Sequence, residues 1–274
     1  MTLCFTIDFF SYLCQSLAQS PFGLGVGNRR IEKNIELTFY LRCINTKLNM
    51  RKFQKLPVIM LMTAMVFAVG CTPEENKDYE NVDLGLPSGT LWATCNVGAT
   101  TPEGYGNYFA WGETESKTTY NWSTYRYCDG QYDQLTKYCT KSNYGYNGFI
   151  DNLKVIQSDD DAATANWGNG WRVPTKDEWQ ELLDNTTSIW TTQNGVKGIL
   201  FTASNGNSLF LPAAGYRWDD GFYEVGSVGD YWSGSLYTDY PHNAWDFYFR
   251  SDSLYYSDRA IGLSVRAVRS ARQN

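Results

Sequence analysis

Residues 245–250, with the sequence Trp-Asp-Phe-Tyr-Phe-Arg, alternate aromatic with polar side chains and bring a carboxylate, a phenol and a guanidinium close together. Because successive side chains of a β-strand point to opposite faces, the aromatic residues should enter the core while Asp246, Tyr248 and Arg250 point outward. The surrounding stretch 237–259 is richer in Tyr, Asp, Ser and Asn than packing requires. The pattern therefore predicts a binding surface.

This surface has the composition of a recognition loop. Tyr gives a large contact area at low entropic cost, and Ser and Asn give adaptable hydrogen bonds. We expect a protein or glycan ligand to contact the polar residues of this stretch. The predicted contact residues are Tyr237, Asp239, Tyr240, His242, Asn243, Asp246, Tyr248, Arg250, Asp252, Tyr255, Tyr256 and Asp258.

Catalytic chemistry finds little support in the residue types. His242 is the only histidine and follows a proline in a turn-like sequence, so a Ser-His-Asp triad is not expected. No cysteine or histidine cluster predicts zinc, and no glycine loop predicts bound phosphate. We predict a protein that is not an enzyme, without catalytic residues, cofactor or metal. A glycoside hydrolase remains the alternative, because the two acids that it needs could come from carboxylates in loops. No spacing singles out one pair among the candidates, which are Glu113, Glu115, Asp219, Asp220 and Glu224.

Two helices are expected in the middle of the chain. The clearer one begins after Thr175, whose side chain can cap free backbone N–H groups while Glu178 reaches back to complete a capping box. The other is expected over residues 158–165, with Ser158 as its cap and three aspartates in the first turn, where the helix dipole favours negative charge. We prefer this interpretation of the aspartate run to a calcium site.

The remaining sequence predicts short strands. Residues 199–203 and 208–211 flank an Asn-Gly turn, and residues 216–218 and 222–223 flank Asp-Asp-Gly, both typical of β-hairpins. Further aromatic-rich strands are expected near residues 231, 245 and 263. Two helices packed on antiparallel strands, with much loop, predict an α+β domain over residues 81–270.

The N-terminal region carries the pattern of a bacterial lipoprotein signal. Basic residues at 51, 52 and 55 precede an apolar run over 56–69, which is shorter than the ~20 residues that a membrane-spanning helix needs. The following Gly70-Cys71 resembles a lipobox, at which the signal is cut and the cysteine is acylated, for example with palmitate. We predict a signal peptide over 50–70 and an acylated Cys71 with a linker over 71–80. An uncleaved membrane anchor is the alternative.

Residues 1–49 do not fit this scheme, because a signal needs its basic region near the true start and Met50 provides such a start. We expect translation to begin at Met50, which leaves residues 1–49 untranslated or disordered. Basic residues cluster before Cys71, so the exported part is more acidic than the net charge of −6 of the whole chain suggests, and it should repel nucleic acid. The acidic run after Cys71 resembles a signal for export to the outer face of the outer membrane, or is a plain solvated tether.

Three cysteines follow Cys71, and an oxidising compartment favours disulfides. Cys128 and Cys139 are the plausible pair, whereas Cys95 is expected to remain a buried thiol. Spacing alone does not establish disulfide geometry, so this pairing is a hypothesis.

Four motifs occur along residues 80–270: VDLGLPSGTLWA at 82–93, WRVPT at 171–175 followed by Glu178-Trp179, YWS at 231–233 and GLSVR at 262–266. In type and order they resemble the Fibrobacter succinogenes major paralogous domain family. That family looks related to the formylglycine-generating, sulfatase-modifying fold, a variant of the C-type lectin fold. The resemblance implies two helices, a small twisted, mainly antiparallel sheet and long loops that carry the ligand surface. Formylglycine chemistry is not expected, because the last cysteine is Cys139.

The C-terminal end is similar to the variable region of diversity-generating retroelement target proteins. In those proteins, copying errors at adenines convert Asn codons into Tyr, Asp, His, Ser and Thr codons, which are the residue types enriched over 237–258. The resemblance implies a lipid-anchored, surface-exposed outer membrane protein whose residues 230–269 are diversified for ligand binding. A binding module of fixed specificity and a structural component of a surface assembly remain alternatives. The residues expected to form an invariant frame are Trp232, Ala244, Trp245, Phe247, Phe249, Gly262 and Val265.

Overall fold

The computed structural model describes residues 79–168, 170–249 and 253–271. Contacts divide the chain into two units, Met1–Thr72 and Pro73–Asn274, and all the described residues belong to the second. No helix in this described part is long and apolar enough to cross a membrane. The predicted start at Met50, the signal over 50–70 and the acylated Cys71 lie outside the described residues, as do Arg250 and Asp252.

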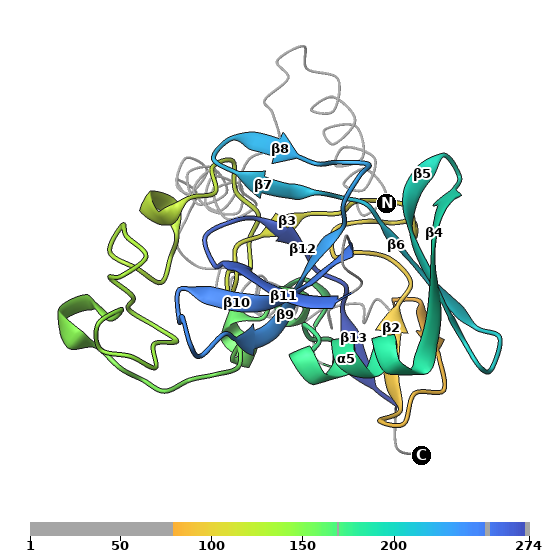
Figure 1. Cartoon of the computed structure of the whole chain (residues 1–274), viewed down its shortest axis with the longest axis horizontal. Helices are drawn as coiled ribbons and strands as arrows, with labels where there is room; N and C mark the ends of the chain where they lie inside the picture. Colours follow the sequence, from red (N-terminus) through yellow and green to blue (C-terminus); the bar gives the residue numbers. More distant parts are fainter. Residues whose placement is uncertain (1–78, 169, 250–252, 272–274) are drawn as a thin grey trace, which may run out of the picture. The chain divides into compact units, whose positions relative to one another are not determined.

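A five-stranded sheet with the order β11-β10-β9-β12-β3 holds the C-terminal stretch (Figure 1). Its neighbours pair antiparallel, except that β12 runs parallel to β9. Consequently β10 is an interior strand and β11 is an edge strand. The strands are β3 (Tyr108–Phe109), β9 (Asp230–Leu236), β10 (Asn243–Tyr248), β11 (Ser253–Asp258) and β12 (Leu263–Ser264).

Three smaller sheets complete the β-structure. One has the order β1-β2-β13, with β1 (Asn81–Asp83), β2 (Thr90–Ala93) and β13 (Val268–Ser270). The next has the order β4-β5-β6, with β4 (Thr186–Gln193), β5 (Val196–Ala203) and β6 (Ser208–Pro212). The last is the hairpin of β7 (Tyr216–Trp218) and β8 (Gly221–Tyr223). Both hairpins expected from their Gly-containing turns, β5–β6 and β7–β8, are confirmed.

The helices are short. They comprise α4 (Ala162–Trp167) and α5 (Lys176–Asn185), with three 3-10 turns at Trp122–Thr124, Tyr146–Gly148 and Ser158–Asp160. The capping box predicted for Thr175 and Glu178 is present at the start of α5. The predicted cap at Ser158 is wrong: it begins a 3-10 turn, and α4 is capped by Asp161, whose side chain accepts a hydrogen bond from Thr164 N.

The predicted α+β fold with one small sheet is wrong. The described residues form 13 strands in four sheets and only two α-helices, so the fold is mostly β. The error has a physical source: β1, β2, β3 and β13 have two to four residues each, too short for a period-two pattern to stand out. They become strands only through pairing with distant partners, such as Trp92 of β2 with Val268 of β13.

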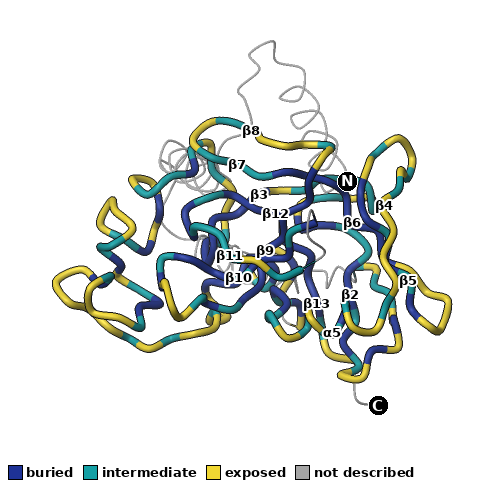
Figure 2. The backbone as a smooth tube through the Cα atoms, viewed as in Figure 1, coloured by how far each residue is buried: buried dark blue, intermediate teal, exposed yellow. Residues whose placement is uncertain are grey.

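The five-stranded sheet lies between two hydrophobic clusters. Trp232 of β9 belongs to one cluster, together with Trp111, whereas the adjacent Tyr231 belongs to the other, together with Trp179 of α5. Successive residues of one strand therefore face different clusters, and both faces of the sheet are covered. The exposed residues lie mainly in the loops and along β4 and β8, whereas the residues of β9 are almost all buried (Figure 2).

Two buried arginines tie loops to this framework. Arg266, in the GLSVR motif, donates to Asn96 Oδ1 and to the carbonyl oxygens of Ala93 and Thr94. Arg259, which follows β11, donates to the Tyr125 hydroxyl and to three backbone carbonyls, one of them that of Pro241. Protein acceptors thus replace water around the Arg259 guanidinium and around most of the Arg266 guanidinium, whose Nη2 has no hydrogen-bond partner among the described residues.

Candidate ligand-binding site

The polar face of β10 is covered rather than free. Asp246 is 0% exposed and Tyr248 is half-buried, so the expectation that both point into solvent is wrong for Asp246. The predicted alternation is present, because Phe247 stacks on Trp179 in one cluster while Asp246 lies on the opposite face. Its face is covered because β9 and β11 flank β10 on both sides and a second cluster packs over that face.

A second carboxylate lies on the same face. In the register of β9 and β10, Tyr248 is opposite Asp230 and Asp246 is opposite Trp232, which makes the two aspartates diagonal neighbours. Asp230 is only 4% exposed. Within the described residues, Asp230 Oδ1 and both carboxylate oxygens of Asp246 have no hydrogen-bond partner. The sequence prediction did not include Asp230.

Burial and mutual repulsion keep protons on this pair. Burial raises the pKa of Asp246 to about 7, an effect that the neighbouring Ser257 side chain offsets only in part. Burial also raises the pKa of Asp230 well above its usual range, and the nearby charges of Asp246 and Glu224 raise it further. Two like charges in a poorly solvated place do not both ionise easily, so the pair shares protons near neutral pH.

A hollow of about 300 Å³ opens over these carboxylates. Its lining comes from β7, β9, β10, β11 and the turn that follows β11, and Figure 1 shows the β7–β8 hairpin on one side of the central sheet. We call this hollow the tyrosine pocket. Its lining residues are Tyr216, Asp230, Tyr248, Tyr255, Ser257 and Ile261.

The tyrosine rings of the pocket are held by neighbouring rings. Tyr216 stacks on Tyr223 with centroids 5.4 Å apart, and Tyr248 lies tilted against Tyr255 at 6.2 Å. Tyr255 is 55% exposed, so its ring forms part of the outer wall. The pocket therefore combines aromatic walls, the Ser257 hydroxyl and the buried carboxyl group of Asp230.

A row of tyrosines continues beyond the pocket along the sheet edge. The Tyr255 ring is parallel to Tyr256 at 5.2 Å, and Tyr256 stacks on Tyr237 at 4.1 Å. Trp245 meets Tyr237 edge-on, and Lys176 Nζ lies 3.7 Å from the Trp245 ring centroid. This row brings together predicted contact residues that lie apart in the sequence.

The other predicted contact residues gather around His242. Its ring lies 5.0 Å from Tyr144 and 5.2 Å from Tyr132, and burial and the Arg259 charge lower its pKa. Tyr240 and Asp239 are exposed beside it. Tyr240 links these loop residues to the row of tyrosines, because its ring centroid lies 6.0 Å from those of both His242 and Tyr237.

Two of the predicted contact residues are more enclosed than expected. Asn243 is buried, with its Oδ1 lacking a hydrogen-bond partner in the described structure. Asp258 is half-buried, and burial raises its pKa. Both residues lie at the end of the β10–β11 pair that is remote from Tyr248, where they are opposite each other.

The predicted disulfide between Cys128 and Cys139 is absent, and both residues are free thiols. The Cys128 Sγ donates to the Trp122 carbonyl, and the Cys139 Sγ donates to the Lys141 carbonyl. The two thiols therefore point to different backbone groups. Cys95 is also a free thiol, half-buried rather than fully buried.

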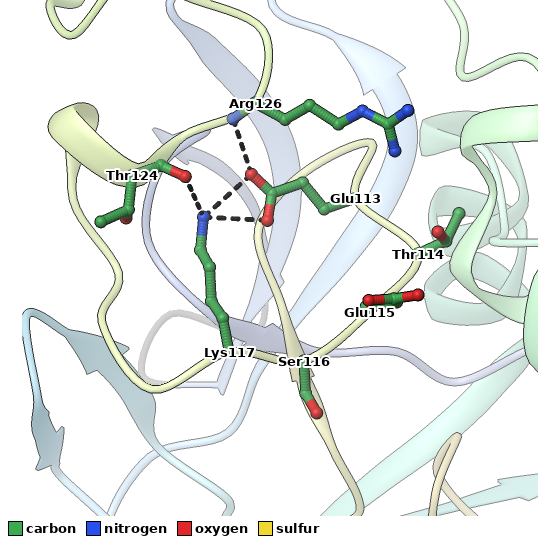
Figure 3. Close-up of a pocket in the computed structure, with 7 residues that line it drawn as sticks. All are labelled: Glu113, Thr114, Glu115, Ser116, Lys117, Thr124 and Arg126. Atoms are coloured by element: carbon green, nitrogen blue, oxygen red, sulfur yellow. Dashed lines mark hydrogen bonds and ion pairs between the residues drawn. The ribbon is translucent and has the colours of Figure 1, made fainter. Parts of the chain in front are cut away.

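A second hollow, near Glu113, has a structural explanation (Figure 3). The Glu113 carboxylate accepts hydrogen bonds from Lys117 Nζ and from the Arg126 backbone N–H, while Glu115 points away from it. Asp219 and Asp220 accept from Asn121 and Thr119, which fastens the β7–β8 hairpin to a neighbouring loop. These loop acids do not form a converging pair.

Comparison with known proteins adds no further assignment. No family model, no curated protein and no solved structure matches this chain. Among the described residues, no group of three or more His, Cys, Asp and Glu side chains could hold a metal ion. The site therefore stands on its own geometry. Of the residues that line the pocket, the predicted contact residues included Tyr248 and Tyr255 but missed Tyr216, Asp230, Ser257 and Ile261.

Proposed function

We propose that this protein is a lipid-anchored, cell-surface binding protein that captures a ligand in the tyrosine pocket without transforming it. The observation that supports this proposal most directly is the pocket itself, in which three tyrosines line a hollow together with the buried Asp230, whose Oδ1 has no hydrogen-bond partner in the described structure. Buried polar groups are normally paired, so an unpaired one in a pocket favours a ligand that completes the pairing. The anchor in this proposal is the lipid on Cys71, and the partner is a protein or glycan at the surface of the outer membrane.

We also propose that residues 230–269 are diversified by a retroelement. In support, the expected frame residues Trp232, Ala244, Phe247 and Val265 are buried. Between residues 237 and 258, most of the described Tyr, Asp, His, Ser and Thr residues, the types that such copying errors produce, are exposed or half-buried, among them Tyr240 and Tyr255. Asp246 differs from these residues, because it is fully buried. A buried position tolerates few replacements. We therefore expect Asp246 to vary less than Tyr255 among copies.

The genomic test is direct. We expect a near-copy of the codons for residues 230–269 downstream of this gene, with Asn codons substituted, next to a reverse transcriptase gene. A locus with neither feature would support the alternative of fixed specificity for one glycan or protein.

The binding test uses one pocket tyrosine and one matched control. Tyr255→Ala removes a wall of the pocket, whereas Tyr146→Ala removes a similarly exposed ring, 42% exposed, far along the chain. The purified full-length protein is screened for binding to a glycan array and to a panel of surface proteins. The proposal is supported if Tyr255→Ala loses binding of a ligand found in the screen and Tyr146→Ala keeps it. It is contradicted if both variants lose that binding equally or if both keep it.

A carbohydrate-active enzyme is the second candidate, and the Asp230–Asp246 pair is the observation that favours it. Glycosidases use two carboxyl groups of which one has a raised pKa. Asp246, however, is fully buried and does not line the pocket, so a substrate could reach only Asp230. A glycan hydrolysis screen decides between the two: turnover that disappears in Asp230→Asn while binding persists would establish the enzyme.

A further inference from the structure

Among the described residues, no cation forms an ion pair with Asp230 or Asp246. The ion pairs in the described part of the chain join Lys117 with Glu113, Lys137 with Asp160 and Arg172 with Glu178, and none of them involves Asp230 or Asp246. A buried carboxylate that is neither paired nor fully hydrogen-bonded is costly. Asp230 lines a hollow of about 300 Å³, and its buried Oδ1 has no hydrogen-bond partner in the described structure.

The walls favour an organic cation over a metal ion. Calcium takes six to eight oxygen ligands and magnesium a near-octahedral set. The pocket offers one lining carboxylate, one serine hydroxyl and three tyrosines. Aromatic faces next to a carboxylate are instead the surroundings in which proteins bind ammonium groups, because the ring face attracts positive charge.

The available acceptors distinguish between kinds of organic cation. A guanidinium fits best against a carboxylate that presents two free oxygens, and a quaternary ammonium donates no hydrogen bond. A primary ammonium has three donors. Those donors can be used by the Asp230 carboxylate, the Ser257 hydroxyl and a tyrosine hydroxyl of the same pocket, while an aliphatic chain would lie along the rings and Ile261.

We propose that the tyrosine pocket binds a primary ammonium group carried on an aliphatic chain, such as a lysine side chain of a protein ligand. This inference rests on the proposed function, because it names the class of group that the same pocket takes. In it, Asp230 pairs with the ammonium, the neighbouring Asp246 adds negative charge when it is ionised, and Tyr216, Tyr248 and Tyr255 surround the methylene chain.

The proposal carries a pH dependence. The titratable groups around the pocket are Asp230 on β9, Asp246 and Tyr248 on β10, Tyr255 on β11, Tyr216 on β7 and Glu224 after β8. The carboxylates near the ammonium hold protons at mildly acidic pH, because their pKa values are raised. A cation competes with those protons, so the affinity for it should rise as the pH rises through about 7.

The test uses a matched pair of probes and the full-length protein. Nα-acetyl-lysine amide carries the ammonium, and Nα,Nε-diacetyl-lysine amide has the same chain without the charge. Binding is measured by ligand-observed NMR titration, with calcium chloride as a third arm. The variants are Asp230→Asn, Tyr255→Phe and Tyr255→Ala. Asp129→Asn, which makes the same change at an exposed aspartate outside the predicted contact residues, is the control.

We expect the charged probe to bind and the neutral probe to bind at least about tenfold more weakly, as the loss of a charged hydrogen bond implies. Asp230→Asn should reduce binding of the charged probe by a similar factor, and Tyr255→Ala by several-fold. Tyr255→Phe and Asp129→Asn should stay within about twofold of the wild type. A loss of binding in Asp129→Asn as large as that in Asp230→Asn would show that the binding follows overall charge and not the pocket, and would overturn the proposal.

The failures separate the two proposals. Equal binding of both probes, with loss in Tyr255→Ala, would overturn the ammonium assignment and leave the pocket as a ligand site. Calcium binding that is lost in Asp230→Asn would also overturn the ammonium assignment, in favour of a metal site. If neither probe binds, or if no pocket variant changes binding, the ammonium assignment is wrong. The proposed binding function of the pocket is then decided separately by the array screen of Tyr255→Ala against Tyr146→Ala.

Discussion

Replacing Asp246 by Asn should change how the stability of this protein depends on pH. The substitution keeps the shape of a side chain that is 0% exposed and removes its ability to ionise. In the native protein, burial raises the pKa of Asp246 from 3.8 to about 7, so the folded chain holds a proton there that the unfolded chain releases. The folded state is therefore favoured at low pH, and this advantage is lost as the pH rises from about 4 through about 7.

The size of the effect follows from that shift. Each unit of pKa difference between the folded and unfolded states corresponds to about 1.4 kcal/mol, so a shift of about three units corresponds to about 4 kcal/mol. Asn resembles the protonated acid at every pH, so the variant avoids this loss. Removing the charge of Asp246 also relieves Asp230, whose pKa that charge raises. Both effects make the variant the more stable protein above neutral pH, and the two proteins should be of similar stability near pH 4.

The assay is urea unfolding of the full-length protein, followed by tryptophan fluorescence at several values between about pH 4.5 and pH 8. The measured quantity is the difference in the free energy of unfolding between Asp246→Asn and the wild type, because other titrating groups cancel in that difference. Asp239→Asn, at an exposed position, is the control for a lost charge and should give a constant difference. Parallel profiles for Asp246→Asn and the wild type would refute the reasoning, as would a wild type that gains stability relative to the variant with rising pH.

Three further predictions concern packing and thiol chemistry. Phe247→Ala should lower the free energy of unfolding by about 3 to 5 kcal/mol, because the ring is fully buried against Trp179; a loss below about 1 kcal/mol in urea titrations would contradict that packing. Gly229→Ala should lower the thermal midpoint, because an added Cβ would lie 2.1 Å from the Phe249 ring, and an unchanged midpoint would show that this ring moves aside readily. Cys128 and Cys139 should both react with iodoacetamide in denaturant without reductant, and a mass spectrum with a linked peptide would show that the thiols pair after all.

Local sequence signals were sufficient wherever a structure depends on neighbouring residues. The capping box of Thr175 and Glu178 predicts the start of α5, because both hydrogen bonds close within three residues. The Asn-Gly turn after Ala203 predicts the β5–β6 hairpin for the same reason. The alternation over residues 245–250 correctly predicts that Phe247 and Asp246 face opposite sides of the sheet. For the site, this reasoning identified Tyr248 and Tyr255 but overestimated how exposed Asp246 is.

Tertiary structure decided which of those opposite sides is covered. A period-two pattern shows that two faces differ, but it does not show how many strands flank the segment or what packs above it. Asp246 is buried because β9 and β11 lie on both sides of β10, and it meets Asp230 only through the register of β9 with β10. Tyr216 and Ile261 enter the pocket from other parts of the chain, and the Cys128 and Cys139 thiols each donate to a different backbone carbonyl and do not pair. Contacts between residues distant in sequence depend on chain topology, and their physical consequences, burial and charge coupling, arise only when the sheets assemble.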